Sequence, residues 1–340
     1  MYRIGFACKW METDQTQKKS VLRELELPYN TRSTTARWLS EQEEHVAIQR
    51  LKEVVTHNVT YMENLVTRVG KNPRELRMVR FGSDILPMYT HEVWKDFYAT
   101  QPSFMATIQQ VFRRVGIIAR HLDVRVSFHP GHFTVLASDR PEVVKSSIAE
   151  MEYHADMLRW MGYGKTFQDA KCNVHISGKL GPAGIMAALP KLSEVARNCI
   201  TIENCEMTHG IEESLELTKH VALVLDVHHH WVREGEYIDP HDERVDEIIS
   251  SWRGVRPTMH YSMSREDLLV GHCVDTKPDM DKLLEQGYKK QKLRAHSDFM
   301  WNKACNKWAF EFTDRFDIMV EAKAKNLASY GFQNEAHAYK

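Results

Sequence analysis

The sequence predicts a single (β/α)8 barrel, in which eight parallel strands close into a ring and helices cover the outside. Three observations support this fold class. Short apolar runs alternate with amphipathic helical stretches along the chain. The apolar runs number eight, as this barrel requires. The last six runs end in His, Asp or Glu, and the carboxyl ends of barrel strands open onto one face, where such folds carry their sites.

The strands are expected where short apolar runs stop at turn residues or polar side chains. They lie at residues 2–8, 78–81, 124–128, 172–175, 199–204, 223–227, 258–260 and 317–321. The connecting helices are expected where apolar residues recur at three- and four-residue spacing. They are predicted at residues 41–69, 104–121, 141–161, 183–198 and 211–219, with one more before residue 258 and a long helical insert before residue 317.

Two connections are longer than ordinary loops between barrel elements. Residues 9–40 are polar and rich in Thr and Lys, and residues 264–294 follow the seventh strand. Long connections of this kind often carry function. We therefore predict one domain over residues 1–340, with long loops at about 9–40 and 264–294.

The overall charge gives no sign of a nucleic-acid partner. Lys plus Arg number 45 against 46 Asp plus Glu, so the formal net charge is -1. This balance counts mildly against DNA binding. Two or three bound divalent cations would nevertheless add about +4 to +6 at a site, so the local charge can oppose the overall charge.

The cysteines and the apolar segments indicate a soluble, intracellular protein. The six cysteines show no C-x-x-C pair and no dense framework, which is typical of reduced thiols. The first residues lack the basic and apolar regions of a signal peptide. Nowhere do ~18 apolar residues run together, as a membrane span would need.

The stretch from Leu223 to Trp231 is the most informative in the chain. An apolar run ends in Asp226, His228, His229 and His230, as expected of a buried strand that delivers ligands. The simpler interpretation is that Asp226 caps the next helix and the histidines form its first turn. The recurrence of the pattern on five further strands favours the ligand interpretation.

Six successive strands end in imidazole or carboxylate groups that converge on one face of the predicted barrel. They are His129, His175, Glu203, Asp226 with His229, His260, and Glu321. Each alone could be a hydrogen-bonded core histidine, a helix cap or a partner of Lys. Together they would bury several carboxylates side by side, which costs several kcal/mol unless cations neutralise them. The set therefore predicts a metal site.

The ligand types indicate which ions the site would hold. Imidazole and carboxylate without thiolate suit Zn, Mn or similar divalent ions. The ligands outnumber what one ion can take, and centres with ions about 3.5–4 Å apart recur in phosphodiester cleavage. Glu203 is the candidate bridging carboxylate, because in strand order it lies between the His129/His175 pair and the remaining ligands.

Several motifs together resemble the UV damage endonucleases, barrel enzymes similar in their centre to endonuclease IV. The resemblance covers most of the chain. It rests on Arg3-Ile4-Gly5-Phe6 with Cys8, Arg80-Phe81-Gly82-Ser83-Asp84-Ile85-Leu86-Pro87, Phe128-His129-Pro130-Gly131, Val174-His175-Ile176-Ser177-Gly178, Ile202-Glu203-Asn204, Leu225-Asp226-Val227-His228-His229, Met259-His260, Ala295-His296-Ser297-Asp298 and Met319-Val320-Glu321-Ala322-Lys323.

The resemblance implies a nuclease that cuts duplex DNA immediately 5′ to UV photoproducts and leaves 3′-hydroxyl and 5′-phosphate ends. It implies that one ion is held by His129, His175 and Glu203, a second by Glu203, Asp226, His260 and Glu321, and a third by His229 and His296. His296 is preferred to His272 because it lies 25 residues before Glu321 (321 − 296), close to the family spacing.

The ligand inventory suggests a mechanism for the cleavage. A metal-bound hydroxide would attack the scissile phosphorus in line. A third ion, or His229 and His296, would stabilise the departing 3′ oxygen. We assign catalytic roles to Glu203, His229 and Lys179, and expect Lys179, Lys9 and Lys323 to steer phosphates.

Three departures from the family pattern stand out. The family often carries a Lys where this chain has Thr258, so the third ion site is expected to be weaker or completed differently. His132 and Phe133 replace the Gln and Tyr that probe the lesion, although an aromatic wedge still fits that role. Asp84 and Lys9 are further expected DNA contacts. The basic run 289–294 in the enlarged connection is either a phosphate contact or a solvated helix face.

Two other functions stay open at this point. A sugar isomerase or epimerase barrel also gathers carboxylates and histidines around divalent ions, and it would act on a ketose and ignore DNA. A catalytically silent lesion-binding protein would bind irradiated duplex without nicking it. For the endonuclease, the expected partner is double-stranded DNA carrying UV lesions, with no membrane contact, and the protein is expected to be a monomer.

Overall fold

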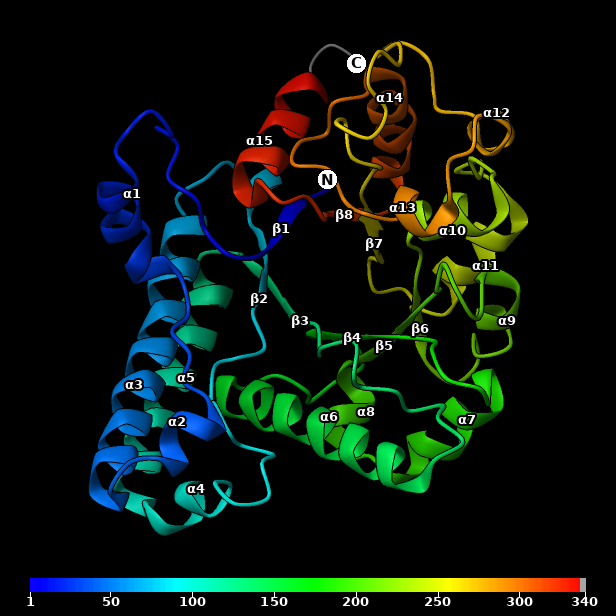
Figure 1. Ribbon diagram of the computed structural model, residues 1–340. Helices are drawn as coiled ribbons and strands as arrows, with labels where there is room; N and C mark the ends of the chain where they lie inside the picture. Colours follow the sequence, from blue (N-terminus) through cyan, green and yellow to red (C-terminus); the bar gives the residue numbers. More distant parts are fainter. Residues whose placement is uncertain (337–340) are drawn as a thin grey trace.

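The protein folds into the predicted barrel of eight parallel strands. The structure, a computed structural model, describes residues 1–336, so the last four residues of the predicted domain lie outside it. The strands form one sheet in the order β6-β5-β4-β3-β2-β1-β8-β7. Figure 1 looks down the ring and shows the helices around its outside. The predicted fold class is confirmed.

All eight strands are short and almost entirely buried, as expected of a parallel sheet covered by helices. Their bounds are β1 Ile4–Cys8, β2 Met78–Phe81, β3 Arg125–Phe128, β4 Lys171–His175, β5 Ile200–Glu203, β6 Ala222–Val224, β7 Thr258–Tyr261 and β8 Asp317–Val320.

The helices follow the strands, and several are shorter or more divided than the sequence suggests. The α-helices are α1 Lys19–Glu26, α2 Ala36–Ser40, α3 Glu44–Val69, α4 Asp96–Thr100, α5 Pro102–His121, α6 Pro141–Met161, α7 Gly181–Ala188, α8 Glu194–Cys199, α9 Ile211–Leu215, α10 Val227–Glu234, α11 Glu243–Ser250, α12 Met280–Glu285, α13 Lys290–Leu293, α14 Lys303–Glu311 and α15 Lys325–Glu335. Short 3-10 turns lie at η1 Leu27–Tyr29, η2 Arg74–Leu76, η3 Leu189–Lys191 and η4 Phe312–Asp314.

The helix predicted over 183–198 is in fact two helices. Pro190 lies within the turn η3 that separates α7 from α8, and Ser193 caps α8 by accepting a hydrogen bond from the backbone N–H of Ala196. Proline cannot donate to a continuing helix, and a serine offers the first turn of the next helix its acceptor. The break therefore follows from the local sequence.

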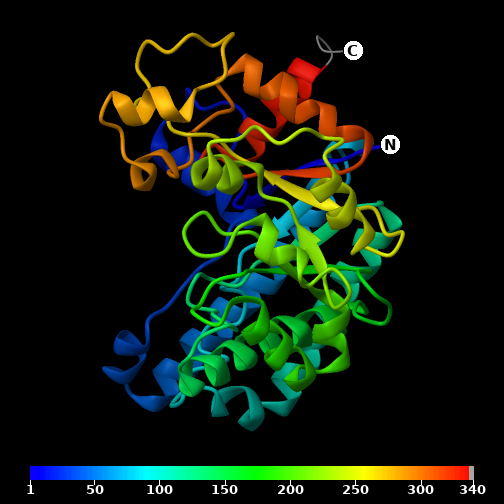
Figure 2. The same cartoon turned by 90° about the vertical axis from the view of Figure 1, so that its right-hand side faces the viewer.

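The two long connections contain short helices, and Figure 2 shows them on the same side of the barrel. Residues 9–40 include α1 and α2, and residues 264–294 include α12 and α13. The first connection is held by the side chain of Asn30, which bonds to both the N–H and the C=O of Trp10 at 2.9 Å. Asn326 does the same for Met11. Within residues 1–336, no helix combines the length and apolar character that crossing a bilayer requires.

The prediction for strand six was partly wrong. The strand ends at Val224, and Asp226 is the N-cap of α10, whose first turns carry the three histidines. The Asp226 carboxylate accepts a 2.7 Å hydrogen bond from the backbone N–H of His229. The capping interpretation of this stretch is therefore correct for the local structure, although Asp226 also reaches the inside of the barrel.

The ring closes between β6 and β7 at residues that carry the predicted site. The backbone N–H of His260 donates to the carbonyl of Leu225 at 2.9 Å, and Asp226 forms an isolated parallel bridge with His260. Asn204 supports this seam, because its side chain bonds to the N–H of Asp226 at 2.8 Å and to its C=O at 2.9 Å. Barrel closure thus brings two predicted ligands together.

A buried carboxylate ties together the amino ends of several strands. Asp317, at the start of β8, accepts hydrogen bonds from the backbone N–H of Arg3 at 2.9 Å and from the guanidinium groups of Arg125 at 2.7 Å and Arg256 at 2.9 Å. These residues begin β3 or precede β1 and β7. One acidic side chain therefore pairs with three arginines at the end of the barrel opposite the site.

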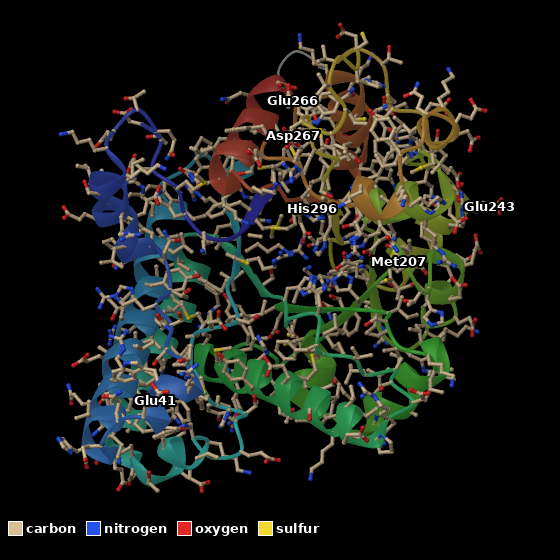
Figure 3. All side chains as sticks on the ribbon, in the orientation of Figure 1. Glu41, Met207, Glu243, Glu266, Asp267 and His296 are labelled. Carbon is tan, nitrogen blue, oxygen red and sulfur yellow. The ribbon has the colours of Figure 1, made fainter. Side chains whose placement is uncertain are left out.

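Replacing Asp317 with Ala should lower the free energy of unfolding by about 3 kcal/mol or more, because three arginines lose a buried partner. Equilibrium urea denaturation measures this change. The matched control is Glu41→Ala, which breaks an exposed pair with Arg37 away from the barrel centre (Figure 3). That pair should contribute less than about 1 kcal/mol. Equal losses in the two variants would contradict the role given to Asp317.

Candidate metal centre

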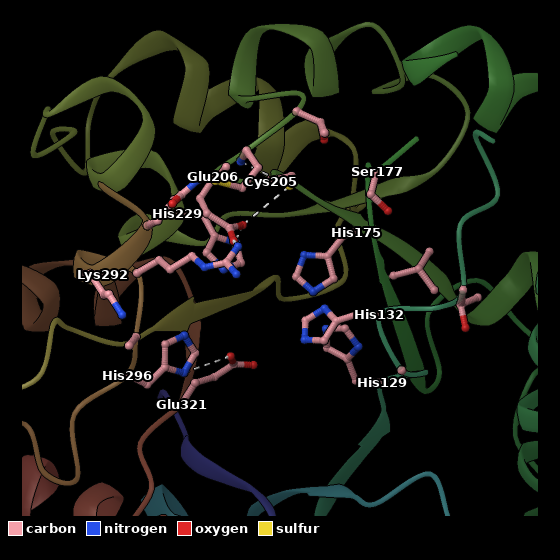
Figure 4. Close-up of a pocket in the computed structure, with 18 of the residues that line it drawn as sticks. His129, His132, His175, Ser177, Cys205, Glu206, His229, Lys292, His296 and Glu321 are labelled. Atoms are coloured by element: carbon pink, nitrogen blue, oxygen red, sulfur yellow. Dashed lines mark hydrogen bonds and ion pairs between the residues drawn. The ribbon is translucent and has the colours of Figure 1, made fainter. Parts of the chain in front are cut away.

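A deep cavity opens at the carboxyl ends of the strands. Its volume is about 1310 Å³. Figure 3 shows nitrogen-bearing side chains gathered near His296 over the middle of the ring, and Figure 4 shows the cavity itself. The cavity walls include the following predicted site residues: His129, His132, His175, His229, His296 and Glu321. The barrel geometry explains this gathering, since its strands all end on the same face.

Glu203, at the end of β5, is the centre of the cluster. Its side chain is fully buried. The oxygen Oε1 lies 3.1 Å from Nδ1 of His260 and 3.3 Å from Nδ1 of His229, and Oε2 lies 3.4 Å from Nε2 of His129. The amide of Asn173 on β4 donates to Oε2 in a short hydrogen bond. One carboxylate therefore contacts side chains from four other parts of the chain.

Two groups of side chains have the spacing that a metal ion requires. His129, His175 and Glu203 form one group, and Glu203, Asp226 and His260 form the other. Within each group, ligand atoms from all three residues lie within 4.8 Å of one another. Glu203 belongs to both groups, as a bridging carboxylate would.

The atoms of these groups that could bind a metal lack hydrogen-bond partners, as expected of a site for a cation. His175 Nε2, Glu203 Oε1, Asp226 Oδ2 and His260 Nδ1 are buried and form no aligned hydrogen bond. Buried polar atoms without partners are rare and costly. A divalent ion with nitrogen and oxygen ligands would satisfy these atoms together. The residues present therefore fit a metal centre.

Backbone carbonyls orient two of the histidines. Nδ1 of His129 lies 2.8 Å from the carbonyl oxygen of Pro130, and Nδ1 of His229 lies 2.9 Å from that of Asn204. Because a carbonyl can only accept, each Nδ1 carries the proton and donates it. In the His129 ring, Nε2 is then left for another partner, the arrangement usual for metal-binding histidines.

The electrostatics of the cluster reflect its crowded negative charge. Burial would raise the pKa of Glu203, but His260, His175 and His129 outweigh burial and hold that pKa well below its usual range. Burial raises the pKa of Asp226 well above its usual range, opposed by His229 and reinforced by the carboxylate of Glu203. The pKa values of the two neighbouring carboxyl groups are thus shifted in opposite directions.

The histidines divide into two kinds. Burial lowers the pKa of His175 to about 3 and that of His260 to about 4, so both rings are neutral at pH 7 and able to bind a cation. His229 is the exception. Burial would lower its pKa, but Asp226, Glu203 and Glu206 raise it to about 10.

Glu321 lies at the edge of the cluster and outside both groups. Its Oε1 is 3.3 Å from Nδ1 of His260, and its Oε2 is 3.9 Å from Nδ1 of His296. The guanidinium of Arg80, on β2, forms a close ion pair with Glu321. Arg80 supplies positive charge beside Oε1 of this carboxylate, and the ion pair does not involve Oε2.

Some predicted residues do not reach the cavity. Lys179 is 79% exposed and forms a 3.1 Å ion pair with Asp139. Lys9 and Asp84 are also exposed and do not line it. His272 faces a separate hollow in the insert rather than the site. The structure therefore gives Lys179 no contact with the cluster.

The loop after β3 lies at the cavity wall. The His132 ring lines the cavity 5.2 Å from the His175 ring, and the neighbouring Phe133 side chain is 70% exposed. A Cβ added to Gly131 would lie 2.5 Å from the Phe133 ring, so the ring rests directly against this glycine. An exposed aromatic ring supported in this way is available to a ligand at the mouth.

Several residues at the site were not predicted. They are Arg80, Asn173, Asn204, Glu206 and Lys171. Asn204 and Arg80 belong to the motifs noted in the sequence, but Lys171, Asn173 and Glu206 carry no such signal. Asn173 and Lys171 face inward only because alternate residues of β4 do, as His175 does.

Lys171 is buried inside the barrel beneath the cluster. Its Nζ lies 3.0 Å from Nε2 of His260, whose Nδ1 faces Glu203 and Glu321. Burial lowers the pKa of Lys171 to about 7, and Arg80 lowers it further. The contact fixes the orientation of the His260 ring, two residues from Thr258 on the same strand.

The fold and the cluster define a class of protein: a (β/α)8 barrel with candidate sites for divalent ions at the carboxyl ends of its strands. The particular family follows from comparison with known proteins. The family described as UV-endonuclease UvdE matches residues 2–340, and the chain belongs to this family of DNA repair nucleases.

Individual relatives agree with this assignment. The UV DNA damage endonuclease of Bacillus cereus (strain B4264) is 25% identical over 319 residues, which covers 90% of this chain and 88% of that protein. The UV DNA damage endonuclease of Bacillus velezensis is 28% identical over 209 residues, covering 58% and 62% of the two chains. The crystal structure of SacUVDE superposes with a TM-score of 0.70 at 22% identity, covering all of both chains. It shares the fold.

Replacing Lys171 with Met should weaken the binding of Mn²⁺ about tenfold or more, because the His260 ring loses the contact that orients it. Isothermal titration of the metal-stripped protein measures this affinity. Lys179→Met is the control, since it removes an exposed lysine outside the cavity. Unchanged Mn²⁺ affinity in a folded Lys171→Met protein would show that the contact does not position His260.

Proposed function

We propose that this protein nicks duplex DNA immediately 5′ to UV photoproducts. The family assignment supports repair nuclease activity in general, and the nicking position is our extension. The single observation that carries the proposal is the group of buried, unpartnered ligand atoms around Glu203 at the floor of an open cavity. Such a floor would receive the phosphodiester of a strand lying across the mouth.

We propose that the site holds two or three divalent ions, Mn or Zn. His129, His175 and Glu203 would hold one, and Glu203, Asp226 and His260 a second, with Glu321 as a further ligand of the second. Bound ions would supply an activated hydroxide and neutralise the charge on the scissile phosphate. His229 and His296 remain our candidates for a third ion.

Three side chains of the protein would have separate roles in binding and cleaving the DNA. Glu203 stays ionised and bridges the two groups of ligands. If the third ion site is empty, His229 would present positive charge to the leaving 3′ oxygen, because Asp226, Glu203 and Glu206 outweigh burial and raise its pKa to about 10. Phe133, exposed at the rim, would fill the space left by unstacked bases at a lesion. Lys179 takes no part in this proposal, because it pairs with Asp139 outside the cavity.

The family assignment favours this function over a sugar isomerase. The partner we propose is double-stranded DNA carrying UV lesions, bound by a monomer. A catalytically silent lesion-binding protein is the remaining alternative. It differs only in the outcome of a nicking assay.

Replacing Glu203 with Gln should reduce the nicking of UV-irradiated supercoiled plasmid about 100-fold to 1000-fold, because the bridging charge is lost. The loss of other groups that stabilise charge in a transition state has effects of this order. Relaxation of the plasmid on agarose gels, with and without irradiation, measures the rate. Glu285→Gln makes the same chemical change at an exposed position of helix α12 and should leave the rate unchanged.

Two outcomes of this assay would count against the proposal. Nicking by Glu203→Gln at the wild-type rate would remove the bridging role. Binding of irradiated duplex by the wild-type protein, without nicking at any Mn or Zn concentration, would select the silent lesion-binding protein.

Removing metal with EDTA should abolish nicking and lower stability, and adding back Mn²⁺ should restore both. At a free ion concentration about 100 times Kd, binding to the folded state stabilises it by about 2.7 kcal/mol. Chemical denaturation with and without Mn²⁺ measures the change. The increment should be largely lost in Glu203→Gln and kept in Glu285→Gln; an increment of equal size in both would contradict the assigned ligands.

A further inference from the structure

The insert between β7 and β8 brings a basic helix to the cavity. Four basic residues lie on α13 or beside its ends, and their side chains point in different directions: Lys289, Lys290, Lys292 and Arg294. Lys290 donates its amine to the carbonyl of Arg233 at 2.5 Å and so holds the insert to the end of α10. Lys292 and Arg294 line the cavity instead. The run is therefore not simply a solvated helix face.

Lys292 differs from the other cations of the cavity wall. Arg80 pairs with Glu321, Arg265 with Asp267, and Arg294 with Glu206 at 3.1 Å. In the described part of the chain, Lys292 has no carboxylate within ion-pair distance. Among the described residues of the wall, it is the one lysine or arginine without a carboxylate partner.

The position of Lys292 is fixed by its neighbour. Leu293 is fully buried in a small apolar core with Trp231 and Val232 of α10, and the hydroxyl of Ser264 donates to the Leu293 carbonyl at 2.5 Å. The helix α10 begins at the Asp226 cap and carries His229. Lys292 and His229 thus lie on two helices that pack against each other.

Figure 4 shows where the amine lies. Lys292 and His296 stand on one side of the cavity, and His132 and His175 stand on the other. A DNA strand with a phosphodiester at the floor of the cavity, between these two sides, would pass beside Lys292. A flexible side chain with a point charge suits contact with a backbone phosphate.

We propose that Lys292 binds a backbone phosphate of the DNA strand that crosses the cavity mouth, with α13 as its support. The inference rests on the proposed function and extends it by assigning a wall of the DNA site to the insert. The contact is to phosphate, so it adds affinity without reading sequence or damage.

Replacing Lys292 with Ala should weaken binding of a short duplex about threefold to tenfold at ~0.1 M salt, and should do so equally for irradiated and undamaged DNA. The slope of log K against log salt should fall in magnitude by about 0.9, which corresponds to one phosphate contact. Fluorescence anisotropy in the Glu203→Gln background, over a range of KCl, measures both quantities. Lys292→Arg should keep most of the affinity and the slope.

The matched control is Lys282→Ala, on α12 of the same insert. Lys282 is 74% exposed, pairs with Asp279 and does not line the cavity. Its loss removes the same charge from the same insert and should leave the slope unchanged. Equal effects of the two substitutions, or no effect of Lys292→Ala, would overturn the proposed contact. If the Glu203→Gln protein with Lys292 unchanged bound no duplex at all, the proposed function itself would be contradicted. This outcome differs from one in which duplex binds and only the Lys292 contact is absent.

Discussion

The ionised carboxylate of Glu203 in the interior of the barrel is the constraint on which the rest of the site depends. A buried charge is costly unless partners stabilise it. Here the partners come from β3, β4, β7 and α10 through His129, Asn173, His260 and His229. The ionisation of Glu203 therefore depends on the positions of these elements. The buried ligand atoms that form no hydrogen bond mark where cations would bind.

The point at which the barrel closes, between β6 and β7, lies at the candidate metal centre. Seven strand pairs form ordinary ladders, whereas β6 and β7 meet through Leu225, Asp226 and His260. A strand that ends early lets Asp226 cap α10 and still face the interior. The opposite end of the ring is held by Asp317 and three arginines. Structural charge and candidate functional charge thus occupy opposite ends of the same strands.

The choice of His296 over His272 rested on the spacing in the family that the chain resembles, whereas the strand count and the convergence of His and carboxylate groups could be predicted from the residues themselves. Strand-end residues of a parallel barrel share one face, so their identities are sufficient for that argument. The placement of Lys179 could not be predicted, because a lysine next to a strand-end motif can turn outward to a carboxylate such as Asp139. Lys171 was missed because its role depends on a contact across the barrel with His260.

By itself, the sequence determined the fold class and the residue types at the mouth, since periodicity and strand-end chemistry are local properties of the chain. Only the tertiary structure decided which groups lie close enough to form a candidate cation site, that Arg80 pairs with Glu321, and that Lys292 rather than Lys290 faces the cavity. Each of these depends on distances between segments far apart in the chain, and no local pattern encodes such distances.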